Sequence, residues 1–218
     1  MFDKFFRIGG QGGRGIGRAL IACAVIGLTA TGVARAEGDP DAGQAKSLVC
    51  AACHGADGNS VNPEWPSLAG QHANYSVRQL RAYQTGLRNN VLMLGQVAGL
   101  SEQDMKDLSA FYEAQTKNPL SAGAGDLELG ERIYRGGNAE TGVSACIACH
   151  GPRGLGNPLE DYPRVGGQHA RYLADTLRDY RSGERQSDED MAQMMRSIAR
   201  RMTDEEIDAV AAFMQGLQ

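Results

Sequence analysis

The chain has 218 residues, of which 42% are hydrophobic and 22% are charged, and its formal net charge is −4. This length allows one or two globular domains. The acidic balance argues against a nucleic-acid partner, because proteins that bind nucleic acid carry a basic surface that neutralises phosphates.

Residues 1–36 have the pattern of a secretory signal peptide. Basic residues precede an apolar run over 19–34, and Ala34-Arg35-Ala36 has the small-x-small form of a cleavage site. We therefore expect an exported mature chain that begins at Glu37. Without residues 1–36 the chain keeps 17 basic and 25 acidic residues, which is a net charge of −8.

Two alternatives exist for this segment. The apolar run is somewhat short for a membrane-spanning helix, but it would also suit an uncleaved anchor. Leu20-Ile21-Ala22-Cys23 loosely resembles a signal for lipidation at cysteine, although most of the apolar run follows Cys23. We expect cleavage, with Cys23 inside the apolar core of the signal.

A Cys-x-x-Cys-His motif occurs twice, at residues 50–54 and 146–150. Such a run is the attachment site of a c-type haem, in which two thiols form thioethers and the adjacent histidine reaches the iron. On a helix, cysteines three residues apart share a face, so both sulfurs can reach one edge of the ring. The motifs predict two covalently bound haem c groups, attached at Cys50, Cys53, Cys146 and Cys149 and ligated axially by His54 and His150.

Zinc binding and dithiol redox chemistry are the alternatives for these motifs. A zinc site more naturally has Cys-x-x-Cys pairs without a histidine directly after both copies, and a thioredoxin-like site has one motif near a βαβ pattern. Here the motif is duplicated in helix-rich, strand-poor sequence, which favours haem. The two motifs also use all four cysteines after residue 36, so none is left for a structural disulfide.

The sequence after residue 37 is a tandem repeat. The two motifs are 96 residues apart, and the later matches, Gly70-Gln71-His72 with Gly167-Gln168-His169, are 97 apart. Copies of this length are whole domains rather than solenoid units. We predict an N-terminal cytochrome c domain over 37–118, a Gly- and Pro-containing linker over 119–126 and a C-terminal domain over 127–218.

Each copy is expected to end in an amphipathic helix. Ser101 and Thr203 have the pattern of N-caps with an acidic residue three positions later, and Thr203 with Glu206 forms a proper capping box. Apolar residues follow both caps at helical spacing. Because each domain has fewer than 100 residues, we expect a buried porphyrin to supply part of its apolar core.

Methionines are the candidates for the second axial position of each iron. Met93 lies seven residues before Leu100, and Met195 lies seven residues before Met202, which occupies the corresponding place. Spacing alone does not separate Met195 from its neighbour Met194, and Met191 is a weaker rival. A thioether opposite histidine would close the coordination sphere and raise the reduction potential, which suits electron transfer.

Two further pairs recur at matched positions. His72 and His169 are alternative ligands, but their context suggests a repeated structural or propionate-bonding role. The carbonyl groups of Pro66 and Pro163 are expected to accept the Nδ1 proton of His54 and His150, which would fix the orientation of each imidazole.

The mature chain resembles the cytochrome c4 family of periplasmic dihaem cytochromes c. The matches include Val49 to Gly55, Asp57 to Ser60, Leu68 to Gln71, Arg135 to Gly137, Gly166 to His169 and the closing helix from Ile207 to Leu217. The resemblance implies an all-α fold of two class I cytochrome c domains, each wrapped round one haem and related by pseudo-twofold symmetry. It implies His54 with Met93 and His150 with Met195 as iron ligands.

The same resemblance implies a soluble or membrane-associated periplasmic electron carrier, not an enzyme. Its partners would be a respiratory donor and an acceptor that leads to a terminal cytochrome oxidase. The segment between Gly86 and Met93 is shorter than in the family pattern. Competing functions are the cytochrome subunit of a flavocytochrome-type dehydrogenase and, more remotely, a dihaem peroxidase, which would need an open iron.

Overall fold

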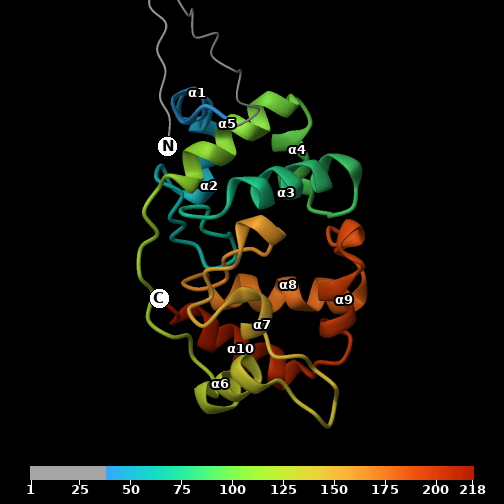
Figure 1. The fold of residues 1–218 in the computed structure, drawn as a ribbon. Coiled ribbons are helices and arrows are strands. Elements are labelled where there is room, and N and C mark those ends of the chain that lie inside the picture. The colour runs from blue at the N-terminus through green and yellow to red at the C-terminus, as the bar shows by residue number, and fades with distance from the viewer. Residues whose placement is uncertain (1–37) are drawn as a thin grey trace, which may run out of the picture. The chain divides into compact units, whose positions relative to one another are not determined.

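The duplicated sequence folds into two sets of five α-helices that follow the same order. The computed structural model describes residues 38–218, and Figure 1 shows the first set in blue to green and the second in yellow to red. The first set comprises α1 (Pro40–Lys46), α2 (Leu48–His54), α3 (Ala73–Thr85), α4 (Val91–Val97) and α5 (Glu102–Glu113). The second comprises α6 (Leu127–Gly136), α7 (Ile147–His150), α8 (Ala170–Ser182), α9 (Met194–Ala199) and α10 (Asp204–Gln215).

The second set also contains two short 3₁₀ helices, η1 (Pro158–Glu160) and η2 (Glu189–Met191). Extended pairing within residues 38–218 is limited to isolated bridges. The all-α fold with two tandem domains is therefore confirmed. The predicted linker lies between the end of α5 and the start of α6, where the backbone N–H of Gly123 donates to the carbonyl of Ala212 on α10 (2.9 Å).

Both closing helices begin with a complete capping box. The hydroxyl of Thr203 accepts from the backbone N–H of Glu206, whose carboxylate accepts from the N–H of Thr203 in return. Ser101 and Asp104 make the same pair of bonds at the start of α5. The side chain of Asp104 is shorter than that of a glutamate, yet it also completes the capping box. Local sequence therefore fixes where each closing helix begins.

The helices α1 to α5 form the first half of the molecule and α6 to α10 the second. In each half the first helix packs closely against the last one at a glycine. A Cβ atom at Gly43 would lie 2.0 Å from the carbonyl oxygen of Asp107, and one at Gly130 would lie 2.2 Å from that of Ala209. Only a residue without a side chain allows this approach of two backbones. The apolar faces beside these crossings form the cores, which include Leu108, Phe111 and Tyr112 in the first half and Ile133, Tyr134, Ile207 and Val210 in the second.

The two halves are joined by reciprocal hydrogen bonds from matched glutamines. The side chain of Gln71 accepts from the N–H of Arg164 (3.0 Å) and donates to its carbonyl (2.8 Å). Gln168 makes the same two bonds with Ser67, at 2.9 and 2.8 Å. The matched positions of the two copies therefore hold each other's backbone, and the described residues belong to one compact unit.

The neighbouring histidines add a second reciprocal pair. Nε2 of His72 donates to the carbonyl of Leu155 and Nε2 of His169 donates to the carbonyl of Ser60, both at 2.8 Å. These bonds give the two histidines the structural role that their repeated context suggested.

None of the helices in the described range is long and apolar enough to cross a bilayer. The predicted signal peptide lies outside that range.

Replacing Gly130 by alanine should destabilise the haem-loaded protein by about 1–3 kcal/mol, because the new methyl group meets the backbone of α10. Gly136→Ala, in the same helix, is the matched control, since a Cβ there has no neighbour within 4 Å. Denaturant unfolding followed by circular dichroism measures both variants. Equal stability of the two would contradict the close crossing.

Candidate haem-binding sites

The first Cys-x-x-Cys-His motif lies on α2 and ends at its last residue. Cys50 is half-buried and Cys53 is exposed, and both are free thiols. The imidazole of His54 is buried, with 7% of its surface exposed, and its Nδ1 donates to the carbonyl of Pro66 (2.8 Å). The helix therefore brings two thiols and a fixed imidazole together.

The second motif repeats this arrangement on the shorter helix α7. Cys146 stands at the N-cap of α7 and Cys149 lies within it, and both are free and half-buried. His150 is as buried as its counterpart, and its Nδ1 donates to the carbonyl of Pro163 (2.9 Å). The prediction for the two proline carbonyls is confirmed.

These bonds prepare both imidazoles to bind a metal ion. A carbonyl can only accept, so Nδ1 carries the proton and Nε2 keeps its lone pair. Burial lowers the pKa of His54 and of His150, which favours the neutral, ligating form. A hydrogen bond to the ring nitrogen that does not bind metal also makes the ligating nitrogen more basic.

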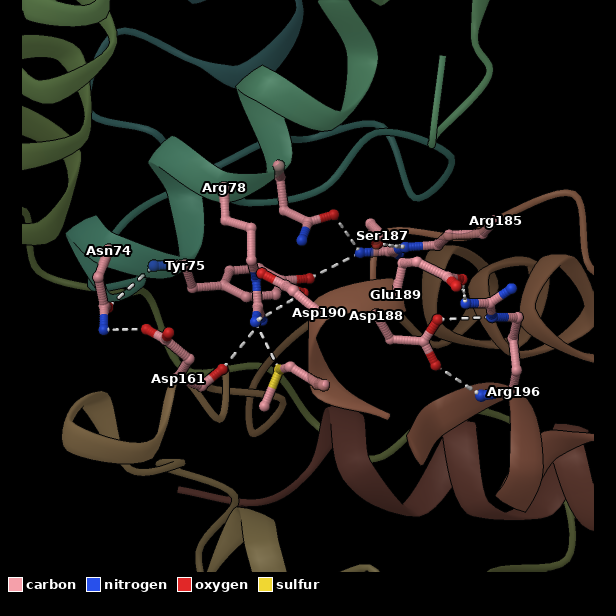
Figure 2. Close-up of polar contacts among 12 residues, drawn as sticks. Asn74, Tyr75, Arg78, Asp161, Arg185, Ser187, Asp188, Glu189, Asp190 and Arg196 are labelled. Atoms are coloured by element: carbon pink, nitrogen blue, oxygen red, sulfur yellow. Dashed lines mark hydrogen bonds and ion pairs between the residues drawn. The ribbon is translucent and has the colours of Figure 1, made fainter. Parts of the chain in front are cut away.

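The candidate methionines lie on α4 and α9. Met93 is in the first turn of α4, where the side chain of Asn90 accepts from its backbone N–H (3.0 Å). Met194 and Met195 begin α9, and Met195 also packs against the core of the second half. The sulfur of Met191 accepts a hydrogen bond from Arg78 of the first half (Figure 2).

One cavity of about 740 Å³ contains all of these groups in its lining. Both motifs contribute their cysteines and histidine to its wall, together with Met93, Met195 and the rival candidates Met191 and Met194. Buried polar atoms of Gln79, Ser109 and Arg164 line it as well and have no hydrogen-bond partner within the described chain. An apolar cavity with thiols, neutral imidazoles and unused polar groups fits haem, whose ring is apolar and whose edge carries carboxylates.

The segments that lead to the two methionines differ in length. Six residues separate Gly86 from Met93, whereas eleven separate Gly183 from Met195. The extra residues form η2 and two left-handed positions, at Ala192 and Gln193 with φ of 53° and 57°.

A buried ion pair braces the longer segment. The carboxylate of Asp188 accepts from Nε of Arg196 (2.7 Å) and from its backbone N–H (2.9 Å), and their side chains are only 4% and 6% exposed. Figure 2 shows that the carboxylate of Glu189 accepts a hydrogen bond from the same guanidinium. Leu94 occupies the position of Arg196 in the first half and is exposed. The two methionines therefore stand in differently supported segments.

The zinc alternative would require at least three suitable side chains in one cluster. Residues 38–218 contain no such group of His, Cys, Asp or Glu.

Sequence reasoning gave no role to Arg88 and Arg185, although both line the cavity. Each follows the glycine that ends a matched helix by two positions, and the two are 97 residues apart. This repetition was the signal that could have identified them.

Comparisons with known proteins agree with this geometry. The cytochrome c family model matches residues 41–114 and 128–218. Cytochrome c4 of Pseudomonas aeruginosa is 42% identical over 201 residues, covering 91% of this chain and 98% of that one. Cytochrome c4 of Thiocapsa roseopersicina is 48% identical over 185 residues, covering 83% and 93%.

A solved structure is similar over the same range. The crystal structure of reduced recombinant cytochrome c4 from Pseudomonas stutzeri matches with a TM-score of 0.80 and 39% identity, over 83% of this chain and 100% of that one. The family model matches once around each of the two motifs. The chain belongs to the cytochrome c4 family: it is a dihaem c-type cytochrome, an electron carrier and not an enzyme.

Proposed function

We propose that His54 and Met93 ligate one haem iron and that His150 and Met195 ligate the other. The thioether bonds would form at the two cysteines of each motif, Cys50 with Cys53 and Cys146 with Cys149. The observation that carries this assignment is the cavity whose wall contains all eight side chains. Met191 and Met194 line it too, and the resemblance to the cytochrome c4 pattern favours Met195 among the three. When bound, the haem iron supplies one-electron redox chemistry.

The proposed ligands of each iron suit electron transfer and not the chemical conversion of a substrate. Two protein ligands per iron leave no position for an external molecule, and a thioether ligand favours the reduced state. The carbonyls of Pro66 and Pro163 hold the imidazole rings in one orientation, so little rearrangement accompanies a change in charge. The surrounding apolar side chains limit the access of water.

We propose further that the protein works in the periplasm, between a respiratory donor and an acceptor leading to a terminal oxidase. The signal-like residues 1–36 support export, and family membership supports the electron-carrier role. The net charge of −8 without residues 1–36 favours partners that present basic docking surfaces. Carriers of this kind dock transiently through small interfaces.

Met93→Ala and Met195→Ala should each leave one axial coordination position of one iron free. The reduced variants should bind one equivalent of carbon monoxide, measured by visible absorption, whereas the unchanged protein should bind none. Met191→Ala is the matched control and should also bind none. Binding of the gas by the unchanged protein would contradict closed coordination, and an open iron in Met194→Ala but not in Met195→Ala would reassign the ligand.

Export should remove residues 1–36. The intact mass of protein from the periplasmic fraction should equal residues 37–218 plus two haems, and Cys23→Ser should be processed identically. A retained N-terminus would indicate an anchor, and a lipid on Cys23 would indicate a lipoprotein.

Membranes from the source organism should oxidise the reduced protein while consuming oxygen. The rate should fall as salt is added, because screening weakens electrostatic attraction between the partners. Membranes treated with cyanide are the control. Absence of oxidation, together with co-purification of a flavoprotein, would favour a dehydrogenase subunit instead.

A further inference from the structure

Two arginines at matched positions lie buried where the two halves meet. Arg88 follows α3 and Arg185 follows α8, and their side chains are 9% and 1% exposed. Their backbones pair in an isolated antiparallel bridge. The two copies of the repeat thus bring two permanent positive charges together.

The guanidinium groups bond across the boundary between the halves. Arg88 donates to the hydroxyl of Tyr172 on α8 and Arg185 donates to that of Tyr75 on α3, both at 2.8 Å. Both also donate to the side-chain oxygen of Gln79, at 3.3 and 2.6 Å. Figure 2 shows Arg185 reaching the first half in this way.

Each guanidinium also stacks on a tyrosine of its own half. Arg88 lies 4.7 Å from the ring centre of Tyr83, and Arg185 lies 4.6 Å from that of Tyr180. These contacts orient the two groups and cover part of their surface. Neither these rings nor the side chains that accept hydrogen bonds from the guanidiniums are carboxylates.

The described part of the chain pairs neither guanidinium with a carboxylate. The ion pairs of residues 38–218 involve other basic residues, and Asp179, the nearby acidic residue, makes none with Arg88 or Arg185. A buried charge without a counter-ion is costly, and arginine cannot relieve that cost by losing its proton. An anionic ligand in the cavity would supply the missing counter-ion.

The cavity offers such a ligand the right surroundings. Arg88 and Arg185 line it together with both haem motifs. Three more N–H groups on its wall, on Arg78, Gln79 and Arg164, are buried without an acceptor. A ligand with several acceptor oxygens and negative charge would satisfy donors and guanidiniums together, and planar carboxylates match the arginine fork.

We propose that Arg88 and Arg185 form one anion-binding site, shared by the two halves, for the carboxylate groups of the bound haems. Each guanidinium contacts side chains of both halves, so we expect its charge to affect both haems. The inference rests on the two haem sites proposed above.

The two guanidiniums also act on a neighbouring hydroxyl. Burial alone would raise the pKa of Tyr172, but the positive charges of Arg88 and Arg185 outweigh it and lower that pKa. Burial dominates at Tyr75, whose pKa is raised.

Arg88→Gln and Arg185→Gln, made separately in the full-length haem-loaded protein, test the proposal. Haem content is measured first, and both midpoint potentials are then determined by spectroelectrochemical titration. Each variant should shift both potentials negative, because a buried positive charge favours the reduced irons. Arg171→Gln, an equal change of charge on an exposed side chain of α8, should shift neither.

Two results would overturn the proposal: fully loaded variants with unchanged potentials, and variants in which only one haem responds. Loss of haem from the unchanged protein would instead count against the haem sites themselves. If a glutamine variant does not bind its full complement of haem, the variants Arg88→Lys and Arg185→Lys test the proposal instead. These keep the charge, so the potentials should change little, while infrared bands of haem carboxylates labelled with carbon-13 should shift; unchanged bands would contradict the contact.

Discussion

Arg88 and Arg185 bury two guanidinium groups at one boundary between the halves of the molecule. Neither can be neutralised by proton loss, and the side chains that bond them are tyrosines, a glutamine, Ser187 and Thr176, none of which is a carboxylate. Each therefore needs the opposite half of the molecule and an anionic ligand in the cavity. Because their hydrogen bonds to Tyr172 and Tyr75 cross the boundary, separating the halves would break these bonds. Folding, joining of the halves and haem binding are coupled through this pair.

Duplication explains how one chain builds such a boundary. Several contacts across the boundary are reciprocal, as with Gln71 and Gln168 holding each other's backbone. The result is one cavity with two metal-binding motifs instead of two separate pockets. The copies differ mainly in the segments before the methionines, where only the second has the buried pair of Asp188 and Arg196. Two irons in unequal surroundings can have different potentials, which gives an electron a direction of travel.

Local patterns in the sequence predicted much of this arrangement. The Cys-x-x-Cys-His motifs, both closing helices and the roles of Pro66 and Pro163 each depend on residues close together along the chain, and the structure confirms the two caps and both proline contacts. The repeated positions of Arg88 and Arg185 could have singled these residues out, but their partners could not be predicted, because they lie 84 and 110 residues away. The choice between Met194 and Met195 also stays open at the sequence level, since adjacent residues share the same spacing.

A crystal structure of the oxidised, haem-loaded protein tests the role of the two arginines most directly. We expect a carboxylate from each haem within hydrogen-bonding distance of Arg88 or Arg185, with the sulfur atoms of Met93 and Met195 bound to the irons. Haem carboxylates directed into solvent, with the two guanidiniums bonded only to protein side chains, would contradict this role.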